Sequence, residues 1–445
     1  MALEKRLRKR LEKTVQTLGD APDKSIPQAC GTMAETHAVY CFFENERVSH
    51  QDILAEHQSE TLLKAQAEKC QLALQDTTTF NFSASAGKRG LGDLENKHCQ
   101  GFLAHTTLAA TTEGVPLGVV AQKVWVRPAE ARGKSKKRHT TPAADKESHK
   151  WVDGLPCAAD GPQGPQPHWI VVCDREAHIY GFMAEALTQK MDFVLRAMQQ
   201  RSTVYDSDEE TYTPLFDAVA AQPVQAWLRL ELKRHPDRAA RQAEVTLRFD
   251  TVTLKQPRRD ETEYATLKVQ FVEIREPNPA PNETAAHWLL LTSLPVTTVA
   301  EAQRVVRYYS YRWLIERLHY VLKSGCRLEE SQLRTEPRLE RLLAVYTLVA
   351  WRLLWMTYQA RVTPDAPCTV AFTQAEWQAL YAHRYKTTVL PESPPDLRTA
   401  VRWVAQLGGF LGRKGDGEPG VKVLWRGYAR LKDLTDAWLI FRSPP

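Results

Sequence analysis

The stretch Trp169-Ile170-Val171-Val172-Cys173-Asp174 decides the fold class of this 445-residue chain. Five consecutive apolar residues indicate a strand that is buried on both faces, as in the parallel sheets of α/β proteins. The aspartate that follows stands at the carboxyl end of the strand, the edge at which open α/β sheets build their sites. The stretch therefore predicts a mixed α/β sheet with a carboxylate at its edge.

Further strands are predicted on both sides of this run. Residue patterns predict strands at residues 72–76, 101–112, 115–126 and 193–195, and a helix at residues 179–187. The first of these strands ends in a second carboxylate, Asp76. Two carboxylates at one sheet edge repel each other unless a cation neutralises them, and Mg²⁺ and Mn²⁺ prefer oxygen ligands. An aspartate after a strand is also common without any function, so each one alone is weak evidence.

Residues 200–290 differ in character from what precedes them. Alternation of apolar and polar residues predicts antiparallel strands at residues 227–232, 245–254 and 267–274. We interpret this region as a β-rich insertion in the α/β core. Residues 301–358 are then strongly helical in pattern.

Composition and charge limit the classes of protein to which this chain can belong. The net charge of +6 permits nucleic-acid binding without requiring it. No segment has the length of apolar sequence that spans a bilayer, and residues 1–13 are basic rather than a signal peptide. We therefore expect a cytoplasmic protein with no membrane partner. The basic helix predicted at residues 3–18 could lie along DNA phosphates or simply face solvent.

The segment at residues 303–323 carries the most specific pattern. On a continuous helix with 100° per residue, four polar side chains share a stripe about 60° wide: Tyr309, Arg312, Glu316 and Lys323. The apolar residues fall on the opposite side, so this helix is expected to pack them inward. An ordinary amphipathic helix with a salt-bridged polar face would give the same charge spacing.

Phosphodiester cleavage explains why these residue types occur together. Two metal ions roughly 3.5–4 Å apart activate a nucleophile and stabilise the leaving oxygen, and they need about three carboxylates. Asp76, Asp174 and Glu316 could supply them. Arg312 and Lys323 could neutralise DNA phosphates, and Tyr309 could donate to a phosphate oxygen.

These residues resemble the Tn-five-like transposases of bacterial insertion sequences, which have an Asp-Asp-Glu triad and a Tyr-x2-Arg-x3-Glu-x6-Lys signature. The chain matches that signature with Tyr309-Ser-Tyr-Arg312-Trp-Leu-Ile-Glu316 and, six residues further, Lys323. Leu74-Gln75-Asp76-Thr77-Thr78 and Val172-Cys173-Asp174-Arg175-Glu176-Ala177 are also similar to the family. The similarity extends over about residues 5–439.

The resemblance implies a three-part chain and a reaction. The parts are a helical DNA end-binding domain at residues 1–60, an RNase H-like catalytic core at residues 61–365 with the β-rich insertion at about 200–290, and a helical dimerisation domain at residues 366–445. The implied protein is a cut-and-paste transposase, nucleoid-associated, that binds terminal inverted repeats as a homodimer in a synaptic complex. It would use two Mg²⁺ ions, with Mn²⁺ as a substitute, to cleave the ends through a hairpin and join the 3′-OH ends to target DNA.

Two more residues gain a role only from this resemblance. Trp288 looks like the family tryptophan that stacks on a base flipped from the DNA end, and Arg196 resembles an arginine near that base. Without the family, Trp288 would be interpreted as a core residue before a buried strand.

Two departures from the family leave alternatives open. The chain begins later than typical members, so part of the end-binding domain is expected to be missing. His178 stands where many relatives have aspartate, and we expect it either beside the metal ligands or on the surface. A catalytically silent, inhibitory relative that acts through mixed dimers is one alternative function, and a stand-alone nuclease is another.

Overall fold

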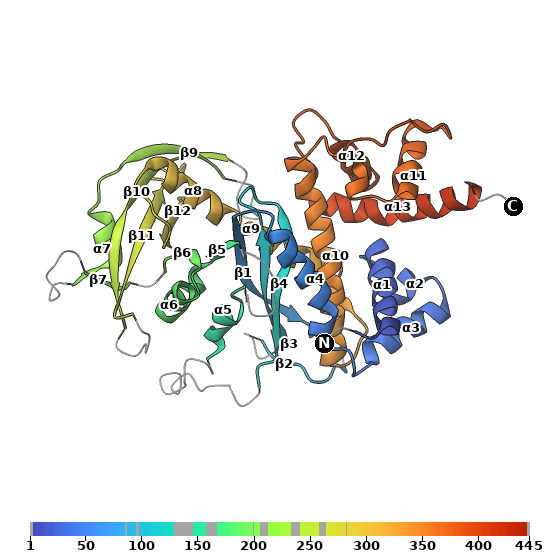
Figure 1. Cartoon of the computed structure of the whole chain (residues 1–445), viewed down its shortest axis with the longest axis horizontal. Coiled ribbons are helices and arrows are strands. Elements are labelled where there is room, and N and C mark those ends of the chain that lie inside the picture. The colour runs from blue at the N-terminus through green and yellow to red at the C-terminus, as the bar shows by residue number, and fades with distance from the viewer. Residues whose placement is uncertain are drawn as a thin grey trace.

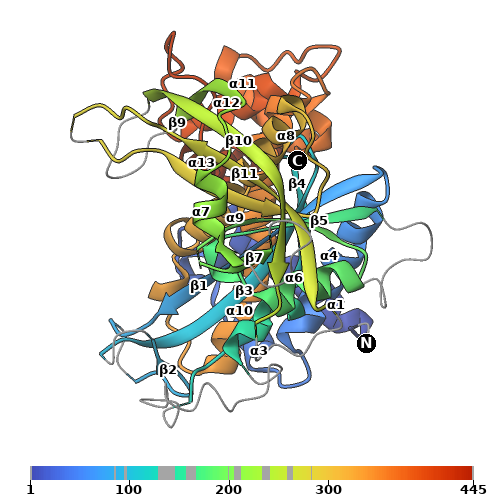
Figure 2. The same cartoon turned by 90° about the vertical axis from the view of Figure 1, so that its left-hand side faces the viewer.

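The computed structural model describes residues 3–84, 87–94, 98–128, 146–156, 167–198, 200–204, 212–232, 241–257, 264–281 and 283–442. A large sheet with helices on both faces forms the main body, and helices from the two ends of the chain lie together at one side of it (Figures 1 and 2). No helix within these residues is long and apolar enough to cross a membrane.

The core sheet is built around one central strand, β1 (Cys70–Asn81). On one side β1 pairs antiparallel with β3 (Gln100–Ala110), which pairs antiparallel with β4 (Pro116–Trp125). On the other side β1 pairs parallel with β5 (His168–Cys173), which pairs parallel with β6 (Asp192–Arg196). The order β4-β3-β1-β5-β6, a meander followed by two parallel strands, is that of an RNase H-like sheet. The predicted mixed α/β fold class is confirmed.

The predicted insertion continues this sheet. β12 (His287–Thr292) pairs with β6, and β11 (Thr266–Arg275) and β10 (Arg241–Lys255) follow outward. The remaining elements of the insertion lie beside β10 or on its edge: β7 (Ser202–Val204), β8 (Tyr212–Pro214), α7 (Leu215–Ala220) and β9 (Ala226–Leu232). The antiparallel strands predicted here are therefore confirmed as β9, β10 and β11. Residues 205–211, 233–240 and 258–263 of the predicted insertion lie outside the described residues.

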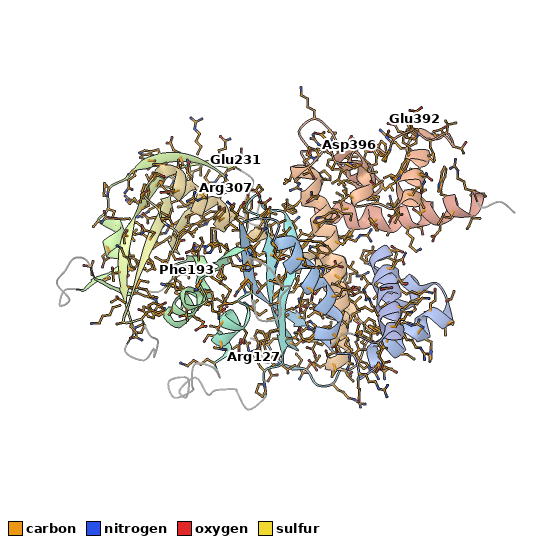
Figure 3. The ribbon with its side chains drawn as sticks, in the orientation of Figure 1. Arg127, Phe193, Glu231, Arg307, Glu392 and Asp396 are labelled. Carbon is orange, nitrogen blue, oxygen red and sulfur yellow. The ribbon has the colours of Figure 1, made fainter. Side chains whose placement is uncertain are left out.

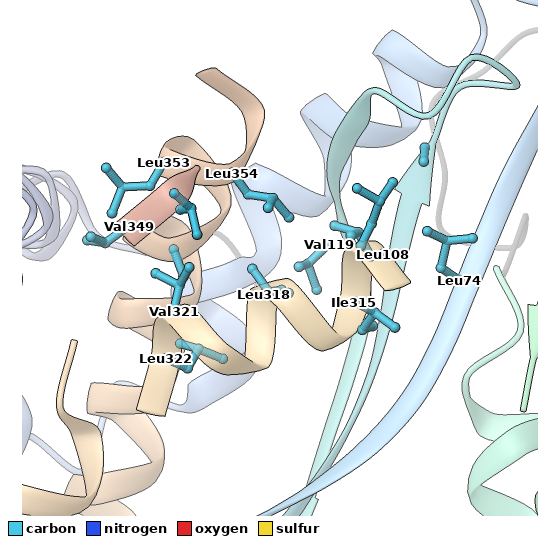
Figure 4. Packing of buried hydrophobic residues seen from close by; sticks show 14 of the residues in the cluster. Leu74, Leu108, Val119, Ile315, Leu318, Val321, Leu322, Val349, Leu353 and Leu354 are labelled. Carbon is cyan, nitrogen blue, oxygen red and sulfur yellow. The ribbon is translucent and has the colours of Figure 1, made fainter. Parts of the chain in front are cut away.

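Three helices cover one face of the core sheet: α8 (Val299–Ser310), α9 (Trp313–Tyr320) and α10 (Glu336–Val362). α9 lays its apolar side on the core strands, where Ile315 and Leu318 are fully buried (Figure 4). Removing a leucine-sized side chain from water contributes about 2 kcal/mol to folding. The expectation that this segment packs its apolar residues inward is confirmed. The other face is covered by α5 (Lys150–Asp153) and α6 (Tyr180–Thr188), above inner residues such as Phe193 (Figure 3).

The two ends of the chain are helical and both pack on α10. The N-terminal helices are α1 (Lys5–Asp20), α2 (Ile26–Cys30), α3 (Met33–Glu44) and α4 (His50–Ala65). The C-terminal helices are α11 (Gln374–Tyr385), α12 (Leu397–Leu407) and α13 (Val421–Arg442). Figure 1 shows the long helix α10 passing from the first group to the second. It is therefore the element that joins both ends of the chain to the core.

One expectation about β1 was wrong. The predicted strand ended at Asp76, whereas β1 continues to Asn81. Its pairing with β5 ends at Leu74, but its pairing with β3 continues as far as Asn81. Asp76 thus lies in the middle of a strand, just where the parallel partner stops.

The continuous helix expected at residues 303–323 was also wrong. α8 ends at Ser310, and α9 begins at Trp313 and passes into a π-helical turn, η6 (Val321–Gly325). At the break the ring of Tyr311 lies against Gly114, where a Cβ atom would come within 2.5 Å of it. The four polar side chains of the predicted stripe therefore belong to three separate segments and a connecting turn.

Arg341 of α10 connects this helix to the N-terminal helices. It is buried, and its guanidinium donates to the backbone carbonyl oxygens of Phe43 and Val48. We expect Arg341→Met to lower the free energy of unfolding by about 2 kcal/mol, because two buried carbonyl groups lose a charged donor. Urea unfolding measures this, with Arg338→Met as the matched control. Arg338 is partly exposed and pairs with Glu44, so its loss should cost less than about 1 kcal/mol. Equal costs for the two variants would contradict this role.

Candidate active site

Four neighbouring strands bring predicted site residues to one face of the sheet. Asp76 lies in β1, Asp174 directly follows β5, Arg196 ends β6 and Trp288 lies in β12, and these strands are adjacent in the order β1-β5-β6-β12. Side chains two residues apart on a strand share a face. The residues two positions before or after these four all lie in the cluster beneath α8 and α9: Leu74, Val172, Val194 and Leu290. The four site residues therefore face α8 and α9.

The two aspartates lie side by side. β1 and β5 are paired at Leu74 and Val172, and each aspartate comes two residues later. Neighbouring strands are about 4.8 Å apart. Burial raises the pKa of Asp174 against a hydrogen bond from the Glu176 amide, and the negative charge of Asp76 raises it further. This edge therefore holds two carboxylates that sense each other's charge.

Arg312 links Asp76 to the third carboxylate. It lies in the turn before α9, and its guanidinium forms an ion pair with Glu316 one turn further along. Its Nη1 atom lies 3.8 Å from Oδ2 of Asp76. Burial works against the charge of Arg312, but Glu316, Tyr309 and Asp76 together raise its pKa above the usual value. A permanent positive charge therefore sits between two of the three predicted metal ligands.

The carboxylates suit a hard divalent cation by their chemistry. Asp76 and Asp174 offer neighbouring oxygen ligands whose mutual repulsion a cation would relieve. Within the described parts of the chain, however, no three His, Cys, Asp or Glu side chains are already gathered as a metal-binding group. The ion pair of Glu316 with Arg312 accounts for this, since Glu316 is engaged elsewhere.

His319 completes the surroundings of Asp76, and the sequence analysis missed it. Its Nδ1 atom lies 3.7 Å from Oδ2 of Asp76, and its side chain is almost fully buried. Burial would raise the pKa of Asp76, but His319, Arg312 and the Thr77 amide together bring that pKa below its usual value. The signal that could have found His319 is its spacing from Glu316. The two residues are three positions apart, and residues three apart on a helix share a face.

Tyr309, Trp288 and Arg196 form a second group beside the aspartates. The rings of Trp288 and Tyr309 meet edge to face, with centroids 5.2 Å apart. Tyr309 is 6% exposed, so it does not share an exposed stripe with Glu316 as expected. Burial raises its pKa, while the charges of Arg312 and Arg196 oppose the rise. Arg196 donates to the His287 carbonyl oxygen at 2.9 Å, which fixes it beside Trp288.

Lys323 lies near the part of β1 that follows Asp76. It belongs to the π-helical turn and is half-buried, with Nζ 5.7 Å from the centroid of the Phe80 ring. Burial lowers its pKa, against the attraction of Glu329 and Asp76. Arg312 and Lys323 thus both act on Asp76 as cationic side chains.

His178 is fully buried, so of the two places expected for it the surface is excluded. It follows the short helix η5 (Arg175–Ala177) that begins at Asp174. The Met198 amide lies 3.1 Å from its Nδ1 atom and Nε of Arg201 lies 3.2 Å from its Nε2 atom, and the ring accepts a hydrogen bond at one of these nitrogens. Burial and the charge of Arg201 lower the pKa of His178 to about 3, so the ring is neutral. It supports the turn that carries Asp174.

Comparison with known families gives three matches along the chain. The models are Transposase DNA-binding at residues 4–48, Transposase DDE domain at residues 135–352, and Transposase Tn5 dimerisation domain at residues 348–441. The second match includes Asp174 and Glu316, and the third covers the end of α10 and the C-terminal helices. Together with the mixed sheet, these matches define a DNA transposase.

The chain belongs to the DDE transposases of the Tn5 type. It has an N-terminal DNA-binding domain, a central DDE domain with a mixed sheet and a helical C-terminal dimerisation domain. Binding to DNA, formation of a dimer and a metal-dependent reaction on DNA follow from these domains. The resemblance noted in the sequence is confirmed, and the boundaries at residues 60 and 365 stay predictions.

The opposite pKa shifts of the two aspartates predict opposite effects on stability. The folded-state pKa of Asp174 is raised, so its ionisation destabilises the fold as the pH rises through that pKa. We expect Asp174→Asn, without divalent ions, to melt at a higher temperature than the native chain at pH 7, with a difference that shrinks towards pH 4.

Asp76→Asn is the matched comparison. The folded-state pKa of Asp76 is lowered, so its charge stabilises the fold at neutral pH, and this contribution is lost as the pH falls through that pKa. The Asp76→Asn variant should melt below the native chain at pH 7. Thermal unfolding of all three proteins between pH 4 and 8 checks both signs, and shifts of the same sign for the two variants would refute the assignment.

Proposed function

We propose that Asp76, Asp174 and Glu316 are the catalytic carboxylates of this transposase and hold two divalent ions, Mg²⁺ in the cell with Mn²⁺ as a substitute. The observation that carries the proposal is that two partly buried aspartates lie on adjacent strands, with Glu316 of α9 connected to Asp76 through Arg312. Two such ions, when bound, supply an activated nucleophile and stabilise the leaving oxygen.

The residues around the carboxylates bind and orient the DNA strand. Arg312 exchanges Glu316 for a phosphate of the strand, because a guanidinium binds phosphate as readily as carboxylate. This exchange frees Glu316 to face the two aspartates. Lys323, near Phe80 further along β1, binds a second phosphate, and Tyr309 lies beside Arg312 as a hydroxyl donor.

Trp288 and Arg196 hold a base that leaves the end of the duplex. Extruding a base costs a few kcal/mol, and stacking on an aromatic ring returns about 1–3 kcal/mol. Trp288 is suited to this because Tyr309 supports its ring edge to face while part of it stays accessible. Arg196, fixed by the His287 carbonyl oxygen, is the cation beside that base.

The complete proposed function is cut-and-paste transposition of an insertion sequence. The N-terminal domain binds terminal inverted repeats, and the C-terminal domain pairs two protomers in a synaptic complex. The DDE domain nicks each end, releases it through a hairpin and joins the 3′-OH ends to target DNA. Family membership supports the DNA-binding and dimer-forming parts of this sequence of events.

Alanine substitution of the triad tests the catalytic assignment. We expect Asp76→Ala, Asp174→Ala and Glu316→Ala each to reduce cleavage of the element's own ends by about 10³-fold, because each removes a ligand of the ions that stabilise the transition state. A gel shift on the same DNA should show binding retained. Glu330→Ala, which removes an exposed acid paired with Arg327, is the control and should cut normally.

Other results would favour the other functions. Metal-dependent cutting that persists in any triad variant would exclude that residue from the site. No cutting by the native chain, together with mixed dimers formed with a longer relative, would indicate the silent, inhibitory protein. Cutting without paired ends would indicate a stand-alone nuclease.

Trp288→Ala tests the base-holding role separately from the first nick. We expect hairpin formation to slow about 10-fold, which corresponds to about 1.4 kcal/mol of lost stacking, with little effect on nicking. Trp288→Phe retains an aromatic face and should recover most of the rate. Single-turnover assays that resolve nicked, hairpin and released products measure both steps, and equal slowing of the two steps would count against this role.

A further inference from the structure

We infer that His319 is a positioning residue that fixes the carboxylate of Asp76 for the divalent cation. The inference rests on the proposed function, because it takes Asp76 to be a metal ligand. His319 itself is assigned no contact with DNA or metal.

His319 and Arg312 approach the same oxygen atom of Asp76. The Nδ1 atom of His319 lies 3.7 Å from Oδ2, and Nη1 of Arg312 lies 3.8 Å from it. Both distances exceed a direct hydrogen bond, so the two groups act on this oxygen by electrostatic attraction. Because a carboxylate is planar, holding one oxygen near these two groups also restricts where the other oxygen points.

A second histidine holds the backbone of Asp76 from the reverse face of the sheet. His105 pairs with Thr77 across β1 and β3, and its Nδ1 atom lies 2.9 Å from the Thr77 hydroxyl. Its Nε2 atom lies 3.2 Å from Oε1 of Gln75. His105 thus bridges the two neighbours of Asp76 in the strand. With the backbone held in this way, rotation of the side chain is the freedom that remains, and His319 restricts it.

The surroundings of His319 argue against a purely packing role. Its Nε2 atom is buried and has no hydrogen-bond partner among the described residues, and a buried unsatisfied polar atom costs about 1–3 kcal/mol. The preceding residue, Leu318, is fully buried in the apolar cluster, so an apolar side chain would suit packing at this helix better than a histidine. The polar atom that contacts a functional group is Nδ1. Groups that hold metal ligands in this way typically contribute 10–100-fold to metal affinity.

The test compares side chains that differ in where they place a donor. Asparagine at position 319 puts an amide nitrogen near the place of Nδ1, glutamine puts it near that of Nε2, and leucine has no donor. We expect His319→Leu and His319→Gln to weaken Mn²⁺ binding by about 10–100-fold, and His319→Asn to recover most of the affinity. Mn²⁺ binding is measured on the full-length chain by electron paramagnetic resonance of free Mn²⁺, without DNA cleavage.

A matched control separates this role from the loss of any buried histidine. His50 is also buried, with Nε2 bonded to Gln122 and with no hydrogen-bond partner for Nδ1 among the described residues, and it lies in α4, away from β1 and α9 in sequence. His50→Leu should bind Mn²⁺ with native affinity. In cleavage assays, His319→Leu should need more Mg²⁺ for half-maximal rate, and saturating Mg²⁺ should restore most of the rate.

Asp76→Asn distinguishes failure of this inference from failure of the proposed function. Native Mn²⁺ affinity in Asp76→Asn would remove the metal role of Asp76 itself. Weak binding by Asp76→Asn with native binding by His319→Leu would overturn the inference alone. If the His319→Leu variant does not fold, the comparison of His319→Asn with His319→Gln decides the test. Equal Mn²⁺ affinities of these two variants would also overturn the inference. In the double variant Asp76→Asn/His319→Leu, we expect no further loss beyond Asp76→Asn.

Discussion

The repulsion between Asp76 and Asp174 is the constraint on which the rest of the site depends. Two partly buried carboxylates on adjacent strands are unfavourable unless positive charge lies nearby, and the pKa of Asp174 is raised mainly by burial and further by the charge of Asp76. The lowered pKa of Asp76 shows where the relief comes from, since Arg312 and His319 both act on that residue. The packing of α9 on β1 brings both of these groups to Asp76. The two aspartates of the sheet carry the negative charge, and Arg312 and His319 at the covering helix partly balance it.

Local sequence patterns predicted much of this arrangement, because they depend on local burial. The apolar run at residues 169–173 became a fully paired inner strand, and the alternating segments became the outer strands of the sheet. The length of β1 was not predictable in this way. Residues 77–81 are polar apart from Phe80, and they are a strand because β3 pairs with them, which is a partner distant in sequence.

The break between α8 and α9 shows why the site could be predicted only in part. Tyr311 and Arg312 are acceptable in a helix, and the contact of Tyr311 with Gly114 that accompanies the break involves a residue nearly 200 positions earlier. A continuous helix would have put Tyr309 and Glu316 on one stripe. The break instead turns Tyr309 inward against Trp288 and leaves Arg312 between Glu316 and Asp76. The residue types were therefore predictable, whereas the partners of Tyr309 and the role of His319 were not.

The same segment connects the active site to the dimerisation domain. The π-helical turn that carries Lys323 ends at Gly325, where a Cβ atom would lie 3.0 Å from the ring of Trp425 in α13. Tyr320, at the end of α9, also packs against Trp425, with ring centroids 5.6 Å apart. Any larger residue at position 325 would push α13 away from the turn or shift the turn itself. Since Lys323 lies between Gly325 and the end of α9, its place beside Asp76 depends on the seating of α13 as well as on the catalytic sheet.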